Sequence, residues 1–205
     1  MSEMGPEASA FDPQTLDYYQ SQAETYGAHR GPVEFPALMN FIERLPAGAQ
    51  VLELGCGGGQ DAEVLICAGL DVTVTDGCPA MAEFAARRLG RPVATLRFDQ
   101  LEKIQAFDGI WANACLLHAP ERALPDIFAR IHRALKSGGL FCATFKGGTI
   151  GARDTLGRYF NYMPAEALLA FIRNSAPWRD VEIEDFDGRD FLGAPTEWLV
   201  VRAWA

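Results

Sequence analysis

The stretch from Val51 to Asp61, which reads VLELGCGGGQD, holds the residues best suited to bind a ligand. An apolar run reaches Glu53, turns through Gly55, Gly57 and Gly59, and continues into a helical pattern. A strand, a tight turn and a helix N-terminus in this order expose backbone N–H groups beside the positive end of a helix dipole. The glycines permit positive φ angles and close approach of a ligand to the main chain.

The spacing of these glycines separates two classes of ligand. A dinucleotide site uses G-x-G-x-x-G, in which the last glycine packs the helix against the strand. Gln60 occupies that position here, and the pattern is E-x-G-x-G-x-G. The spacing therefore favours a nucleoside over a pyrophosphate, with an ordinary structural turn as the alternative.

Polar side chains follow the neighbouring predicted strands. Asp76, Asp99 and Asn113 each stand where such a strand ends. Since ligands of open parallel sheets bind at the carboxyl ends of the strands, we expect these side chains at one mouth. Asp76 is suited to accept hydrogen bonds from two ribose hydroxyls, or else it caps the next helix. Glu53 ends a buried strand and needs partners, because an unpaired buried carboxylate is costly.

Strands and helices alternate along most of the chain. Parallel strands are expected at about 50–54, 71–75, 93–96, 107–112 and 140–145. This alternation predicts a Rossmann-like α/β sandwich of three layers, with a mostly parallel sheet covered on both faces. Two further apolar segments, 178–186 and 198–204, are expected to pair antiparallel.

The remaining segments complete the predicted organisation. Residues 1–11 are expected to be a disordered lead, and residues 12–205 a single domain. The helix over 124–135 carries a regular apolar stripe and is expected to end at Gly138-Gly139. Residues 147–161 are glycine-rich and polar, which predicts a long loop.

Composition narrows the classes of partner. The 205 residues carry a net charge of −9, which disfavours binding to a nucleic-acid backbone. We expect no membrane partner and a cytoplasmic location, because no signal peptide or membrane-length apolar run is present. The five cysteines contain no C-x-x-C pair, and no histidine cluster predicts a metal site.

Several motifs together resemble the class I S-adenosylmethionine-dependent methyltransferases over about residues 15–205. They are E-L-G-C-G-G-G, Asp76, Asp99, F-D-G-I-W-A-N and L-K-S-G-G-L-F. The resemblance implies a seven-stranded sheet whose last strand is antiparallel, S-adenosylmethionine as cofactor, and in-line methyl transfer to a small molecule. L-L-H-A-P and G-R-Y-F-N-Y look more narrowly like small bacterial methyltransferases related to tellurite-resistance proteins. A monomer and a homodimer both stay open.

The resemblance also implies roles for individual residues on the cofactor side. The turn would line the methionine moiety, Asp76 would bind the ribose, Asp99 with Gln100 would meet the adenine amine, and Asn113 with Ala114 would pass beneath the sulfonium. Tyr26 and Arg30 look like the family's N-terminal lid, and Arg30 is suited to the cofactor carboxylate. The full cofactor-binding set is Tyr26, Arg30, Glu53, Gly55, Cys56, Gly57, Asp76, Met81, Asp99, Gln100, Asn113 and Ala114.

Candidates on the acceptor side are fewer. His118 is a candidate base or substrate-orienting residue, and packing or helix capping is its alternative. Lys146, Arg158 and Tyr159 are candidates for binding an anionic acceptor, against an ordinary solvated loop. Sulfur, selenium or tellurium nucleophiles need no base, whereas oxygen or nitrogen acceptors use one. The rival functions are a non-catalytic sensor of S-adenosylmethionine or its product, and a nicotinamide-dependent oxidoreductase.

Overall fold

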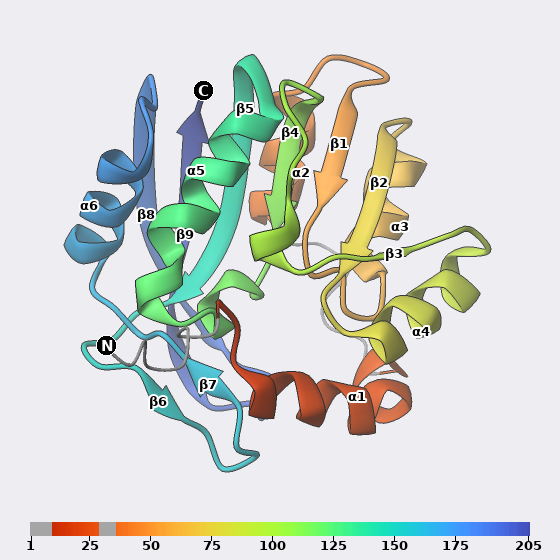
Figure 1. The fold of residues 1–205 in the computed structure, drawn as a ribbon, viewed down its shortest axis with the longest axis vertical. Coiled ribbons are helices and arrows are strands. Elements are labelled where there is room, and N and C mark those ends of the chain that lie inside the picture. The colour runs from red at the N-terminus through yellow and green to blue at the C-terminus, as the bar shows by residue number, and fades with distance from the viewer. Residues whose placement is uncertain (1–9, 29–35) are drawn as a thin grey trace, which may run out of the picture.

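The glycine turn follows an inner strand of the main sheet. The computed structural model describes residues 10–28 and 36–205. The sheet has seven strands in the order β3-β2-β1-β4-β5-β9-β8 (Figure 1). Its strands are β1 (Gln50–Glu53), β2 (Asp71–Asp76), β3 (Ala94–Thr95), β4 (Phe107–Ala112), β5 (Leu135–Lys146), β8 (Asp180–Arg189) and β9 (Pro195–Trp204).

The pairing confirms the predicted mixture of strand directions. The five strands from β3 to β5 are parallel, and β9 pairs antiparallel with both β5 and β8. Strands β8 and β9 are longer than predicted. Their pairing continues to Arg189 and Pro195, beyond the point where Lys146 pairs with Trp198 and β5 ends. The extra length forms a two-stranded ribbon below the sheet.

Two apolar cores cover the two faces of the sheet. Neighbouring strand residues alternate between them, as Val51 and Leu52 do in β1. Helices α5 (Leu124–Ala134) and α6 (Ala165–Ser175) cover the front face in Figure 1. Helices α2 (Pro36–Glu43), α3 (Gln60–Cys67) and α4 (Pro79–Leu89) contribute to the other side. This is the predicted arrangement of three layers.

Helix α5 ends earlier than predicted. Its stripe of Leu124, Ile127, Phe128 and Ile131 is buried, as expected. The prediction that Gly138-Gly139 terminates the helix is wrong, because the helix stops at Ala134. Leu135 is already extended, with ψ 143°, and pairs with Phe107, so sheet pairing replaces the last helical turn. An irregularity in the β4–β5 register between Phe107 and Gly109 accommodates the glycines.

Helix α1 (Pro13–Ala28) lies across the carboxyl ends of the parallel strands (Figure 1). Asp12 begins it, because its Oδ1 accepts hydrogen bonds from both the backbone N–H and the hydroxyl of Thr15, at 2.8 and 2.7 Å. Gly27, at its far end, lies against the ring of Phe84 in α4. The helix therefore spans the mouth in which the ligand-binding residues were predicted.

The segment predicted as a loop contains a short hairpin. Strands β6 (Ala152–Arg153) and β7 (Tyr159–Phe160) form a separate two-stranded sheet. Two residue pairs are too short to give an alternating pattern, so the sequence carried no strand signal here. In the described part of the chain, no helix has the length and apolar character needed to cross a membrane.

Candidate functional site

The glycine turn has the geometry that its sequence predicted. Gly55, Gly57 and Gly59 have φ angles of 64°, 54° and 80°, and α3 begins directly afterwards. A Cβ atom on Gly55 would lie 2.5 Å from Cβ of Cys115. Glycine is therefore required at position 55 both for its φ angle and for the close approach of the chain that follows β4.

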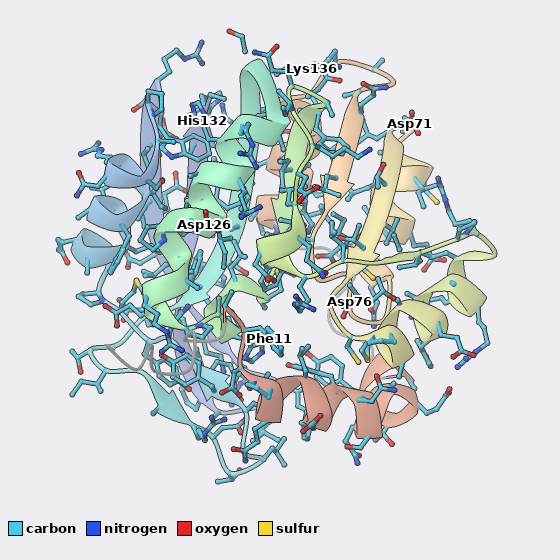
Figure 2. The ribbon with its side chains drawn as sticks, in the orientation of Figure 1. Phe11, Asp71, Asp76, Asp126, His132 and Lys136 are labelled. Atoms are coloured by element: carbon cyan, nitrogen blue, oxygen red, sulfur yellow. The ribbon has the colours of Figure 1, made fainter. Side chains whose placement is uncertain are left out.

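Asp76 faces the glycine turn. Its Oδ2 accepts a hydrogen bond from the Gly57 N–H at 2.9 Å, and its Oδ1 accepts one from the Cys78 N–H at 2.8 Å. Burial raises the pKa of Asp76 to about 6, and these two hydrogen bonds partly offset the effect. Figure 2 shows the residue at the end of β2 that faces α1. Asp76 therefore lies beside the glycine turn, and its contact with a ribose stays a prediction.

Two more carboxylates lie beside the turn. Glu53 is 3% exposed, and its Oε2 has no hydrogen-bond partner within the described residues. Burial, with Asp61 and Asp76 nearby, raises the pKa of Glu53 well above its usual value. Asp61, in the first turn of α3, accepts hydrogen bonds at Oδ2 from Trp111 Nε1 at 2.8 Å and Asn113 Nδ2 at 2.9 Å. Sequence reasoning missed Asp61, whose only signal was its place just after the glycines.

The end of β4 is held in an uncommon conformation. Ala114 has φ 48°, in the left-handed region that non-glycine residues rarely adopt. Its N–H donates to Thr144 Oγ1 at 2.8 Å, and that hydroxyl donates to Asn113 Oδ1 at 2.6 Å. Asp61 binds the other end of the Asn113 carboxamide. A connected set of hydrogen bonds therefore fixes the turn at this strand end.

The predicted adenine-binding residues lie together after β3. Both oxygens of Asp99 contact the Arg97 guanidinium, at 3.1 and 3.2 Å. Gln100 Oε1 accepts a hydrogen bond from the Arg97 N–H at 3.1 Å. The guanidinium also lies over the ring of Phe11, 4.7 Å from its centroid. Phe11, the last residue of the predicted lead, thus packs near this end of the site.

Other predicted cofactor residues lie under or within α1. Met81 is buried in a small cluster with Cys78 and Ala23, and Tyr26 packs against this cluster. The Tyr26 ring also stacks on Phe191, with centroids 4.7 Å apart. Cys56 is buried within the turn itself. Arg30 lies outside the described residues, so its predicted contact with the cofactor stays a prediction.

His118 makes hydrogen bonds through both ring nitrogens. Its Nδ1 lies 2.6 Å from the Tyr159 carbonyl oxygen, which only accepts, so Nδ1 carries the proton. Its Nε2 then accepts from the Tyr19 hydroxyl of α1, at 2.9 Å. Burial lowers the pKa of His118 to about 4, so the ring is neutral near pH 7. The structure thereby joins His118 to Tyr19, a residue that sequence reasoning did not select.

The predicted basic residues of the acceptor side are buried and paired. Arg158 is 2% exposed and binds Asp154 through Nε and Nη2, at 2.9 and 2.7 Å. Its Nη1 donates to the Tyr19 hydroxyl at 3.2 Å. Lys146 Nζ lies 3.4 Å from Asp190 and 4.2 Å from the centroid of the Phe160 ring. The solvated-loop alternative is therefore wrong for these two residues.

Aromatic rings surround the Arg158 guanidinium. The distances from its Cζ to four ring centroids lie between 5.3 and 5.9 Å, for Tyr18, Phe160, Phe191 and Tyr19. These rings come from α1, β7 and the turn between β8 and β9. The guanidinium thus joins three elements that are far apart in sequence.

A cavity of about 560 Å³ lies beside the acceptor side. Its walls come from the start of α1 and the residues before it, the segment before α5, the β6–β7 hairpin and α6: Phe11, Asp12, Pro13, Pro120, Glu121, Arg122, Arg153, Tyr159 and Phe171. Tyr159 belongs both to this wall and to the hydrogen bond with His118. Among the residues described, no group of three or more His, Cys, Asp or Glu side chains is arranged to hold a metal ion.

Comparison with known proteins relates this chain to methyltransferases. Residues 51–139 match the family model described as a methyltransferase domain. The chain is 33% identical over 112 residues to squalene methyltransferase 1 of Botryococcus braunii, a match that spans 50% of this chain and 29% of that protein. It is 26% identical over 215 residues to a ubiquinone biosynthesis O-methyltransferase of Xanthomonas oryzae pv. oryzae, covering 89% of this chain and 86% of that protein.

The fold comparison extends over the whole chain. The 1,6-didemethyltoxoflavin-N1-methyltransferase of Burkholderia thailandensis, solved with its substrate and S-adenosylhomocysteine, has a TM-score of 0.73 at 22% identity and covers 98% of this chain. The match spans 92% of that structure and shows the same fold. The narrower relation to tellurite-resistance proteins is not confirmed. Residues 51–139 are a methyltransferase domain, and the relatives and the shared fold agree in indicating an S-adenosylmethionine-dependent methyltransferase.

Proposed function

We propose that this methyltransferase acts on an oxygen or nitrogen atom of a small molecule that loses a proton during transfer. The observation that carries the proposal is the hydrogen bond between Tyr19 of α1 and His118, which lies in the short turn after β4. A thiolate, selenide or telluride acceptor has no proton to lose. A neutral hydroxyl or a neutral amine does so as its new bond to the methyl group forms, and a buried tyrosine–histidine pair offers a path for that proton.

The cofactor side would hold and orient the methyl donor. S-adenosylmethionine supplies an electrophilic methyl group on a sulfonium centre, and transfer is an in-line displacement. The main task of the protein is to align a nucleophile about 3 Å from that methyl group. Asp76 would bind the ribose hydroxyls, since its Oδ2 contacts the turn at Gly57, its Oδ1 accepts from Cys78, and a carboxylate oxygen can accept more than one hydrogen bond. The tight turn at Ala114 would support the sulfonium end.

The acceptor side would remove the proton. The Tyr19 hydroxyl donates its own proton to His118 Nε2, accepts from Arg158 and also interacts with the Tyr26 hydroxyl, whose place an acceptor O–H or N–H would take. As the bond to the methyl group forms, the acceptor proton passes to Tyr19 and the Tyr19 proton passes to His118. The Tyr159 carbonyl accepts from Nδ1–H and steadies the imidazolium that results.

The charges on this side support a neutral acceptor better than an anionic one. Arg158 is neutralised by Asp154, and Lys146 by Asp190. An anion would therefore meet little net positive charge there. Lys146, Arg158 and Tyr159 would then act as walls of the acceptor site. The neighbouring cavity of about 560 Å³, largely apolar in its lining, is the proposed route of entry.

The relatives are consistent with both acceptor atoms. The Xanthomonas relative is named as an O-methyltransferase of ubiquinone biosynthesis, and the Burkholderia structure as an N-methyltransferase. Neither chooses between oxygen and nitrogen for this chain. Both act on small molecules, which supports a small-molecule acceptor over a macromolecule.

The test is methyl transfer to a panel of phenols, hydroxyquinones, amines and thiols, with Tyr19→Phe, His118→Gln and the matched control Tyr18→Phe. We expect turnover to fall about a hundredfold in His118→Gln and about tenfold in Tyr19→Phe, with none lost in Tyr18→Phe. Affinity for S-adenosylhomocysteine, measured by calorimetry, should stay unchanged in all three. Full turnover in His118→Gln, or methylation of thiols alone, would refute the proposal.

A further inference from the structure

We propose that Asn161 is a positioning residue for His118, which it holds in place through the backbone turn that carries the imidazole. The inference rests on the proposed function, because it concerns the residue that would accept the proton. It connects two motifs that are far apart in sequence, L-L-H-A-P at residues 116–120 and G-R-Y-F-N-Y at residues 157–162.

The turn that carries the histidine has too few backbone donors of its own. Leu116–His118 is a single 3₁₀ turn, in which the Ala119 N–H donates to the Leu116 oxygen at 3.0 Å. Pro120 follows and has no N–H, and Ala119 before it is extended, with ψ 140°. The turn therefore cannot continue as a helix, and its last carbonyl groups need donors from another segment.

Asn161 supplies these donors. Its Nδ2 donates to the carbonyl oxygens of Leu116 and Ala119, at 2.9 and 3.0 Å, and its backbone N–H donates to the Leu117 oxygen at 2.7 Å. The three carbonyl groups lie on both sides of His118 in the chain. Asn161 and the three residues that it binds are each 2% exposed or less, so the protein itself must satisfy these carbonyl groups.

The two residues before Asn161 contact the imidazole itself. The Tyr159 carbonyl accepts from Nδ1 at 2.6 Å, and the Phe160 ring lies 4.5 Å from the imidazole, centroid to centroid. Tyr159 is fixed in turn, because its N–H donates to Thr15 Oγ1 of α1 at 2.8 Å. Three consecutive residues thus hold the backbone and the ring of His118, so that Nε2 faces the Tyr19 hydroxyl.

A purely structural role for Asn161 is the competing explanation. Buried carbonyl groups without donors cost stability wherever they occur, so a less stable variant does not separate the two roles. The state of the imidazole does separate them. A positioning role requires that the tautomer and the pKa of His118 change when the Asn161 side chain is removed.

The surroundings of the imidazole define the expected direction of that change. Burial is the main cause that lowers the pKa of His118 to about 4. The other groups that face the ring are the Tyr159 carbonyl, the Tyr19 hydroxyl, Arg158, Lys146 and Asp154. All of them are retained in Asn161→Ala. A turn that loosens would admit water to the ring, and the pKa would rise.

The experiment is a nitrogen-15 NMR titration of the three histidines. The signals of His118 are those absent from His118→Gln. In the wild type we expect the Nδ1–H tautomer and a pKa of about 4, and in Asn161→Ala a mixture of tautomers and a pKa closer to the ordinary 6.5. The matched control is Val72→Ala, in the core on the other face of the sheet, which should lose stability without changing these signals.

Turnover gives a second, separate measurement. For a compound of the panel that the wild type methylates, kcat should fall about tenfold in Asn161→Ala, and affinity for S-adenosylhomocysteine should stay constant. Adding His118→Gln should cause no loss beyond that of His118→Gln alone, because both changes act through the same imidazole. Full turnover in His118→Gln would refute the proposed function, whereas the titration still decides whether Asn161 holds the ring.

Three results would overturn the inference. They are an unchanged tautomer and pKa of His118 in Asn161→Ala, equal changes in Val72→Ala, and wild-type kcat in Asn161→Ala beside a slow His118→Gln. Should Asn161→Ala fail to fold, Asn161→Asp takes its place, since aspartate keeps the size of the side chain but has no N–H for the two carbonyl groups. Unchanged His118 signals in that variant reject the role equally.

Discussion

The two halves of the site are built in different ways. On the cofactor side, the link between the glycine turn and Asp76 relies on the main chain, and the Gly57 N–H binds Asp76 from only 19 positions away. The acceptor side, which comprises Tyr19, His118 and Arg158, relies on side chains from distant segments. Tyr19 lies 99 positions from His118 and 139 from Arg158. Local motifs can encode the first kind of site, and only the folded chain assembles the second.

The two sides also differ in charge. The carboxylates of the cofactor side have no cationic partner in the described part of the chain, which suits a ligand that brings positive charge. On the acceptor side, Arg158 and Lys146 each have a carboxylate partner and aromatic neighbours. Mutations on the two sides should therefore affect different measurements.

The largest effect is expected from Arg158→Ala. Removing one partner of a buried ion pair leaves Asp154 uncompensated and the surrounding rings without their central cation, at a cost of about 3 kcal/mol in the free energy of unfolding. Chemical denaturation measures this loss. Arg153→Ala breaks a more exposed pair with Asp12 and should lower stability far less. Equal losses in the two variants would contradict the acceptor-side assembly.

Arg158→Leu sharpens the same comparison on function. If Arg158 lines the acceptor site, KM for the acceptor should rise while the affinity for S-adenosylhomocysteine stays constant. An unaltered KM in a folded variant would limit Arg158 to holding α1 against the hairpin.

The next effect is expected on the cofactor side. Asp76→Ala should weaken S-adenosylhomocysteine at least tenfold, because the ribose would lose a charge-assisted partner and two backbone N–H groups would lose theirs. Calorimetry is the measurement, and Tyr19→Phe is the control that should bind normally. Wild-type affinity in Asp76→Ala would remove the ribose-binding assignment.

The smallest expected effect is on how the free energy of unfolding depends on pH, to which Asp76 and His118 contribute with opposite sign. The pKa of Asp76 is raised to about 6 in the folded protein, so between pH 4 and 6 the folded state binds more protons and stability falls as pH rises. The pKa of His118 is lowered to about 4, so the unfolded state binds more protons and stability rises over the same window. Each slope is at most about 1.4 kcal/mol per pH unit, the limit for one proton.

Single variants should separate these two slopes. Relative to the wild type, Asp76→Asn should become more stable as pH rises from 4 to 6, and His118→Gln should become less stable. Denaturation curves at pH 4, 5 and 6 give the differences, in which the contributions of other groups cancel. Slopes of the same sign in both variants would contradict the environments that the structure gives to these residues.

Much of the fold was predictable because its signals are local. Apolar strand runs, the glycine turn and the stripe of α5 each lie within about a dozen residues, and the structure confirms them. The end of α5 and the β6–β7 hairpin were missed because pairing with another segment decides both. Apolar periodicity does not encode such a partner.

The site residues also differ in whether their signals are local or depend on distant segments. Asp76 was predictable because it ends a strand next to the turn that it binds. Asp61 and Tyr19 were missed because their partners, Trp111 and His118, come from other elements. Lys146 and Arg158 were selected by charge, but the carboxylates that neutralise them were not foreseen.

The closeness of α1 to the glycine turn has one more consequence. A Cβ atom on Gly58 would lie 2.6 Å from the Gly27 carbonyl oxygen, so the helix seats on the turn with only a hydrogen atom between them. A methyl group at position 58 would clash with the Gly27 carbonyl oxygen and push α1 away from the turn. The same shift of α1 would draw Tyr19 away from His118, so a side chain at position 58 on the cofactor side would interrupt the proposed proton path on the acceptor side.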